Sequence, residues 1–373
     1  MKVGLLTLPP LTNYGGILQA FALQRVLQKL GHDTYLINRR NSAISRNSYL
    51  KMRLKSYYMS LKGIKTNWVF SEKARKERER LLSFNTQLFI DKYIQPQTKS
   101  FNTPTGFQDI PRFDAYIVGS DQVWRPQYTS NIYDYFFDFL GESKSLRIAY
   151  AASFGLDEWT FTEEMTAKCR SLISKFKSVS VRESDAIDLC NKYLGVEAYH
   201  VLDPTMLLTV DEYLSLIDLS RTENSGGELM SYILDNNSEK EKLVNEIADD
   251  QDLKVFNLAL LNLDQKGNII PIPPVENWLR GFIDAKFIVT DSFHGTVFSI
   301  LFNKPFIAIA NSSRGISRFI SLLRIFDLEN RLVLDVNNVD KLLGINDINW
   351  DKVNSILNIK RTESLSFLSQ SLS

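Results

Sequence analysis

The chain has 373 residues, of which 44% are hydrophobic and 23% are charged. This length exceeds what one hydrophobic core usually organises, so two domains are expected. With 44 basic and 43 acidic residues the net charge is +1, which gives no broad electrostatic field to attract nucleic acid. The two cysteines and three histidines lack metal-ligand spacing, so we predict no metal site.

The first ten residues, MKVGLLTLPP, hold a short apolar run that ends at a pair of prolines. Later stretches also fall short of the roughly 18 uncharged apolar residues that a membrane-spanning helix needs. We therefore expect a cytoplasmic protein, and we leave open a contact with the inner face of the membrane.

The N-terminal region has the pattern of a βαβ unit. Residues 2–7 form a β-type run, 9–16 a loop of turn formers, 17–30 an apolar helical pattern and 33–38 a second strand. A unit of this kind is right-handed, and it implies a parallel sheet that is covered on both faces.

Residues 47–92 depart from this pattern because they are basic and helical, with segments such as KARKERERLLSFN. Charges spaced four residues apart are typical of a solvated helix face. The same block would also suit contact with a polyprenyl-phosphate substrate at a membrane surface. We predict an insertion in the first domain and keep both interpretations.

The βα pattern resumes in both halves of the chain. Further strands are predicted at 115–118, 147–151, 178–181, 229–234, 254–258, 286–290 and 305–310. A polar, glycine-containing stretch predicts a linker at 206–227. We predict an α/β protein whose two Rossmann-like domains, 1–205 and 228–350, face a cleft as in the glycosyltransferase-B (GT-B) class. A C-terminal helix at 351–373 could pack back on the first domain.

The segment KFIVTDSFHGTVFSI joins an apolar strand to an apolar helix through polar residues. Asp291 or Ser292 can cap this helix. His294 lies in its first turn, where unpaired N–H groups and the helix dipole favour a phosphate or a carboxylate. A protonated His294 would add a charge-assisted hydrogen bond, so we predict an anion site here.

Arginines supply further positive charge. Arg182 ends the strand SVSV, and its guanidinium suits a phosphate or a carboxylate; a surface pair with Glu183 or Asp185 is the alternative. Arg314 and Arg318 follow the last predicted strand of the second domain, and either could add charge to the cleft.

Two more turns follow strands of the first domain. The first is a glycine-rich turn that lets the backbone approach a ligand, formed by Asn13, Tyr14, Gly15 and Gly16. The second is GSDQVW, in which Asp121 could accept a proton from an acceptor hydroxyl and Trp124 could stack on a sugar. A capping aspartate and a core tryptophan are the alternative.

Over about residues 1–40 and 113–320 the chain resembles the polysaccharide pyruvyl transferase family, because six segments occur in the family's order. They are NYGGILQAFALQRVL, FDAYIVGSDQVW, RIAYAASFG, SVSVRESDA, HVLDPTMLL and FIVTDSFHGTVFSI. The resemblance implies a GT-B-like fold, phosphoenolpyruvate as the donor, a sugar acceptor, and no metal or nucleotide cofactor. Residues 47–89 lie outside it.

The resemblance also implies roles for residues at matching positions. The donor site would comprise Arg182, Ser292, Phe293, His294 and Gly295, with Arg314 added for its charge. Some family members have arginine in place of Ser292, so Arg314, Arg318 or a lysine must supply that charge. We predict that His294 and Asp121 are catalytic, and that the glycine-rich turn, Asp121 and Trp124 bind the acceptor.

The predicted activity is therefore transfer of a pyruvyl group from phosphoenolpyruvate to a sugar, as a ketal, in the synthesis of a bacterial exopolysaccharide, capsule or cell-wall glycan. The sugar acceptor could be lipid-linked, and no nucleic-acid partner is expected. A nucleotide-sugar-dependent GT-B glycosyltransferase is the first alternative, because a fold alone does not decide function. A non-catalytic glycan-binding protein is the second.

Overall fold

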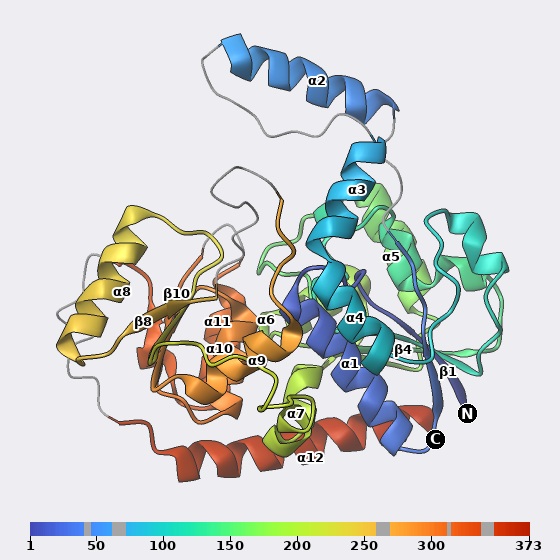
Figure 1. Cartoon of the computed structure of the whole chain (residues 1–373). Coiled ribbons are helices and arrows are strands. Elements are labelled where there is room, and N and C mark those ends of the chain that lie inside the picture. Colours follow the sequence, from blue (N-terminus) through green and yellow to red (C-terminus); the bar gives the residue numbers. More distant parts are fainter. Residues whose placement is uncertain (41–45, 62–71, 259–268, 312–314, 337–346) are drawn as a thin grey trace.

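The computed structural model describes residues 1–40, 46–61, 72–258, 269–311, 315–336 and 347–373. These residues form two lobes, each built on a parallel β-sheet that is flanked by helices (Figure 1). The arrangement confirms the predicted fold class of two Rossmann-like α/β domains.

The sheet of the first lobe has six parallel strands in the order β2-β1-β3-β4-β5-β6. Central strands such as AYIV are buried along their whole length, as expected for a parallel sheet with both faces covered. The strands are β1 (Lys2–Leu6), β2 (Asp33–Leu36), β3 (Ala115–Val118), β4 (Leu146–Ala152), β5 (Ser178–Val181) and β6 (Tyr199–His200).

The sheet of the second lobe has five parallel strands in the order β11-β10-β9-β7-β8. The two-residue edge strands β6 and β11 were not predicted, because so short a run carries no periodic signal. The strands of this sheet are β7 (Leu229–Tyr232), β8 (Val255–Asn257), β9 (Phe287–Thr290), β10 (Phe306–Ile309) and β11 (Leu332–Val333).

Helices connect the strands of both lobes. The α-helices that the structure describes are α1 (Tyr14–Lys29), α2 (Arg46–Leu61), α3 (Glu72–Leu82), α4 (Phe84–Tyr93), α5 (Glu163–Ile173), α6 (Asp185–Leu189), α7 (Val210–Leu214), α8 (Ser238–Asp250), α9 (Val275–Asp284), α10 (Phe293–Leu301), α11 (Ser317–Ile325) and α12 (Trp350–Leu372). Figure 1 shows α12 running beneath both lobes so that the two chain termini lie close together. Its Ser364 hydroxyl accepts a hydrogen bond from the Leu202 backbone of the first lobe, at 3.0 Å.

The helical block at 47–92 divides into two unlike parts. Helix α4 packs against α1 and buries Phe89 and Ile90 in the core of the first lobe. Helices α2 and α3 instead extend away from the body, with α2 at the far end (Figure 1). Only α2 and α3 therefore form an arm outside the Rossmann-like core.

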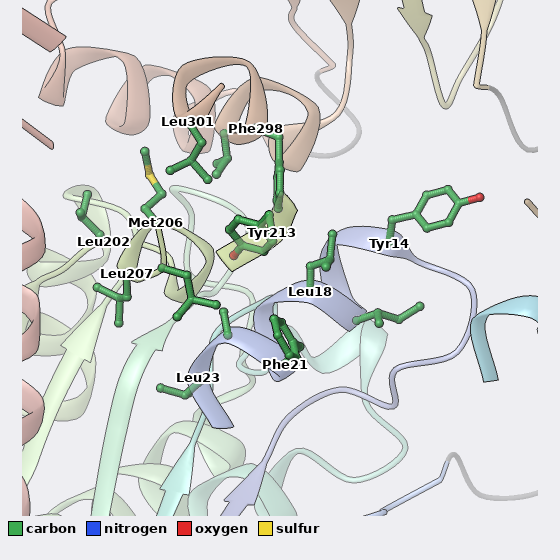
Figure 2. Packing of buried hydrophobic residues seen from close by; sticks show 14 of the residues in the cluster. Tyr14, Leu18, Phe21, Leu23, Leu202, Met206, Leu207, Tyr213, Phe298 and Leu301 are labelled. Carbon is green, nitrogen blue, oxygen red and sulfur yellow. The ribbon is translucent and has the colours of Figure 1, made fainter. Parts of the chain in front are cut away.

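One hydrophobic core runs through both lobes. Leu18 and Phe21 of α1, Tyr213 of α7 and Phe298 of α10 lie in the same cluster (Figure 2). The ring centroids of Tyr213 and Phe298 are 5.0 Å apart. The first half of the predicted linker, which includes Tyr213, is therefore buried between the lobes by its apolar side chains.

Candidate functional site

Four polar residues meet where the carboxyl ends of the two sheets face each other. Asp121, Arg182 and Asp203 follow β3, β5 and β6 of the first lobe, and His294 lies in the first turn of α10, after β9 of the second. Each of the four is at most 8% exposed. Ligands of α/β proteins bind at this end of a parallel sheet, so this convergence defines the candidate site.

Asp203 is the centre of the polar contacts. Its Oδ2 accepts hydrogen bonds from Arg182 Nη1 and Ser120 Oγ, both at 3.1 Å, and lies 3.6 Å from His294 Nε2. Its Oδ1 accepts hydrogen bonds from the Thr205 backbone at 3.0 Å and hydroxyl at 2.7 Å. Burial alone would raise the pKa of Asp203, but His294 and Arg182 hold that pKa well below its usual range. The ionised carboxylate therefore links a basic side chain from each lobe.

His294 lies between the lobes. Ser292 Oγ accepts a hydrogen bond from Gly295 N at 3.3 Å and thereby caps α10, which fixes the turn that carries His294. A Cβ atom added to Gly15 would lie 2.0 Å from His294 Nδ1, so α1 begins directly against the imidazole. His294 Nε2 is buried and makes no hydrogen bond with the described residues. Two helix N-termini thus adjoin a basic side chain, an arrangement that favours an anion.

Arg182 is buried with only part of its hydrogen-bonding capacity used. Its Nε donates to Glu183 Oε1 at 2.9 Å, and its Nη2 makes no hydrogen bond with the described residues. The guanidinium lies over the ring of Phe293, 4.3 Å from the centroid. Burial disfavours its charge, yet Glu183, Asp203 and Asp121 together raise the pKa of Arg182 above its ordinary value. A permanent cation with a buried donor atom to spare is suited to binding an anion.

Arg318 of α11 is a second arginine beside the ring of Phe293, which Arg182 also contacts. Its guanidinium lies 5.5 Å from the centroid of the Phe293 ring, and the residue is 6% exposed. Burial, and then the positive charge of Arg182, lower the pKa of Arg318 to about 10. Two buried guanidinium groups near one ring repel each other, and a bound anion would relieve that repulsion.

Asp121 has an unusual backbone conformation. Its φ of 75° is in the left-handed region that residues other than glycine seldom adopt. Its Oδ1 accepts a hydrogen bond from Gln122 N at 2.9 Å, and a Cβ atom on Gly16 would lie 3.5 Å from its Oδ2. The carboxylate therefore lies between the basic cluster and the glycine-rich turn, and such outliers gather at functional sites.

The structure corrects the predictions for Trp124 and Tyr14 as acceptor-binding residues. Trp124 is fully buried, stacks on Phe136 at 5.1 Å and donates its indole N–H to Tyr135 O at 3.2 Å. Tyr14 is 1% exposed and donates its hydroxyl to Pro273 O at 2.8 Å. Neither ring has a free face, because each fills an apolar space in the core.

Several predicted residues have structural tasks near the site. Asn13 caps α1, since its Oδ1 accepts a hydrogen bond from Gly16 N at 3.2 Å. A Cβ atom on Gly295 would lie 2.3 Å from Thr290 Oγ1, so this glycine allows α10 to pack against β9. Arg314 lies outside the described residues.

Sequence reasoning did not assign roles to Asp203 and Glu183, and it left Arg318 as one of two choices. Asp203 stands in the segment HVLDPTMLL, directly before a proline, and two residues separate it from the end of a strand too short to be recognised. Its position at the carboxyl end of a parallel strand was the signal that could have identified it.

Other reactive groups are accounted for within the described part of the chain. No group of three or more His, Cys, Asp and Glu residues there could hold a metal ion. Burial raises the pKa of the Cys169 and Cys190 thiols to about 12, so neither is a nucleophile at neutral pH. Within the same residues, the apolar length needed to cross a bilayer is not reached by any helix.

The solved structures with a similar fold include UDP-GlcNAc 2-epimerases. UDP-GlcNAc 2-epimerase from Neisseria meningitidis, bound to UDP-GlcNAc, is 11% identical, covers 100% of this chain and 99% of its own, and has a TM-score of 0.51. The UDP-GlcNAc 2-epimerase from Methanocaldococcus jannaschii is 14% identical, covers 96% of this chain and 99% of its own, and has a TM-score of 0.47. At such identities a likeness shows the fold alone, and the Neisseria structure supports the GT-B arrangement of two lobes.

Comparison of the sequence with known families gives a more specific result. No curated protein matches the chain. The family model described as polysaccharide pyruvyl transferase matches residues 13–313, a span that contains Asp121, Arg182, Asp203 and His294. The chain therefore belongs to the polysaccharide pyruvyl transferase family.

Proposed function

We propose that this protein transfers the pyruvyl group of phosphoenolpyruvate to two hydroxyls of a sugar and forms a ketal. The observation that carries the proposal is the buried cluster of Arg182, Arg318 and His294 around Phe293. Two buried nitrogen atoms of this cluster make no hydrogen bond with the described residues: Arg182 Nη2, and His294 Nε2, which lies 3.6 Å from Asp203 Oδ2. Phosphoenolpyruvate carries a phosphate and a carboxylate, and three basic side chains match these two anionic groups.

The reaction balances with the sugar and the donor alone. Protonation of the methylene carbon of phosphoenolpyruvate makes a methyl group and leaves positive charge at C2. One sugar hydroxyl adds to C2, the bond from C2 to the phosphate oxygen breaks, and a second hydroxyl closes the ketal. Of the two hydroxyl protons, one replaces the proton given to the methyl carbon and the other leaves with phosphate. No metal or nucleotide cofactor takes part in this scheme.

The side chains of the site divide these tasks. Arg182 and Arg318 would bind the phosphate and the carboxylate and stabilise the charge that phosphate acquires as it leaves. His294, held by Asp203, would deliver the proton or complete the anion site. Asp121, between the basic cluster and the glycine-rich turn, would accept a hydroxyl proton.

The lobes must separate for substrates to enter. The residues of the cluster are at most 8% exposed, and α1 of the first lobe lies against His294 of the second. Closure of the lobes on both substrates would exclude water from the charged intermediate. The acceptor would be a sugar of a bacterial exopolysaccharide, capsule or cell-wall glycan.

The test is phosphate release from phosphoenolpyruvate by the purified protein, with a panel of lipid-linked and nucleotide-linked sugars as acceptors. We expect acceptor-dependent release that His294→Ala abolishes and that His32→Ala, a change at the surface, leaves intact. Turnover of a nucleotide sugar, with no release from phosphoenolpyruvate, would instead establish a glycosyltransferase. Binding of a glycan with no turnover of either donor would establish a glycan-binding protein.

A further inference from the structure

Helix α2 carries an apolar stripe that faces solvent. Leu50, Leu54, Tyr57 and Tyr58 follow the spacing of one helix face, and they are 50%, 70%, 66% and 55% exposed. Figure 1 shows this helix at the far end of the arm, apart from both sheets. Exposed apolar residues that gather on one face mark a contact surface, whereas single ones do not.

Basic residues border this stripe. At 3.6 residues per turn, Arg53 and Lys55 lie on opposite sides of it, and both are exposed. The sequence of α2 contains four basic residues and no acidic one. Together α2 and α3 hold nine of the 44 basic residues of the chain and three of the 43 acidic ones, so the arm concentrates positive charge in a nearly neutral protein.

A second feature with exposed apolar side chains lies at the base of the arm. A cavity of about 670 Å³ beside α3 and α4 is lined by basic residues such as Arg40 and Lys76, by the apolar residues Phe84 and Leu88, and by the acidic residues Glu79 and Asp91. Phe84 and Leu88 are 53% and 58% exposed.

We propose that the arm formed by α2 and α3 docks the protein on an anionic phospholipid bilayer. Leucine and tyrosine side chains on one face would enter the boundary between headgroups and acyl chains, where tyrosine is favoured. The flanking arginine and lysine would contact lipid phosphates, which is the charge complementarity that selects a bilayer over a neutral protein partner. This inference does not depend on the chemistry of the cleft, because no residue of the arm belongs to the candidate site.

Vesicle co-sedimentation of the full-length protein tests the proposal, with phosphatidylglycerol vesicles compared with phosphatidylcholine vesicles. We expect binding to the anionic vesicles that weakens as salt is raised. The variants Leu54→Ser/Tyr57→Ser and Arg53→Glu/Lys55→Glu should each weaken this binding about tenfold or more. All four side chains are exposed, so the thermal unfolding midpoint should not change.

A matched control is the variant Leu219→Ser/Arg221→Glu, which changes an exposed leucine and an exposed arginine away from the arm. It should bind vesicles as the unaltered protein does. Equal binding by all variants, or equal binding to neutral vesicles, would overturn the proposal. The proposal would also be overturned if sedimentation analysis showed that the arm variants change only the self-association of the protein. An activity assay with a water-soluble acceptor tests the proposed activity separately from membrane binding, because the arm variants should retain turnover of such an acceptor.

Discussion

Asp203 Oδ2 lies 3.6 Å from His294 Nε2, and this contact joins the first lobe to the second. The same oxygen accepts a hydrogen bond from Arg182, so one buried carboxylate positions two of the three basic groups of the site. The site is therefore complete only when the lobes are together.

Asp203→Asn keeps the shape of the side chain and removes its charge. Arg182 keeps its ion pair with Glu183, but the buried carboxylate charge beside Arg182 and His294 is lost, so we expect the free energy of unfolding to fall by about 3 kcal/mol. Phosphate release should fall about 100-fold, because the basic groups lose their position. Denaturant titration and initial rates measure the two effects. The exposed Asp211→Asn should change neither quantity, and an Asp203→Asn protein as stable and active as the parent would refute the assigned role.

Gly15→Ala tests the contact between α1 and the imidazole. The added methyl would lie 2.0 Å from His294 Nδ1, so His294 must move. We expect a loss of about 1–3 kcal/mol in unfolding free energy and about 100-fold in rate. In Gly16→Ala the methyl would meet Asp121 Oδ2 at an ordinary 3.5 Å, so stability should hold or rise by up to about 1 kcal/mol. Equal stability of the two variants would contradict this packing.

Arg318→Ala tests whether the second guanidinium binds the donor. We expect the KM for phosphoenolpyruvate to rise about tenfold or more, with a smaller rise for Arg318→Lys, which keeps the charge but loses the planar group. Arg324 lies on the same helix with its side chain 68% exposed, and Arg324→Ala should leave KM unchanged. An unchanged KM in Arg318→Ala would mean that Arg314 or a lysine, and not Arg318, supplies this positive charge to the donor site.

Stability should fall as the solution becomes acidic. Burial lowers the pKa of His200, whose Nε2 lies 3.0 Å from Arg182 O. Below about pH 6.5 the unfolded chain therefore binds a proton that the folded chain resists, and folding is penalised. Asp203 lowers the stability of the fold further once the pH falls below about 4, because its pKa is depressed in the folded state.

Thermal unfolding midpoints measured from pH 8 to pH 3 give this dependence. His200→Gln should flatten the decline between about pH 6.5 and 5, and the more exposed His32→Gln should flatten it less. A midpoint that stays level across this range in the parent protein would show that His200 is not held neutral by the fold.

The alternation of strands and helices was predictable because both sheets are parallel and buried, so their strands are short apolar runs between helical patterns. Ser292 was foreseen as one of two possible caps, with Asp291 as the other, and the structure assigns the cap to Ser292. The core position of Trp124 was foreseen only as the alternative, and that of Tyr14 was not foreseen. An aromatic residue in a turn can face a ligand or a core, and only the packing of distant segments such as Phe136 or Pro273 decides which.

The central claim is that the buried basic cluster binds phosphoenolpyruvate. The most direct measurement is calorimetric titration of the purified protein with phosphoenolpyruvate, compared with UDP-GlcNAc under the same conditions. We predict saturable binding of phosphoenolpyruvate, with a gain of about 2.7 kcal/mol in unfolding free energy at 100 times its dissociation constant, and no competition from UDP-GlcNAc. Saturable binding of UDP-GlcNAc with no heat from phosphoenolpyruvate would contradict the account.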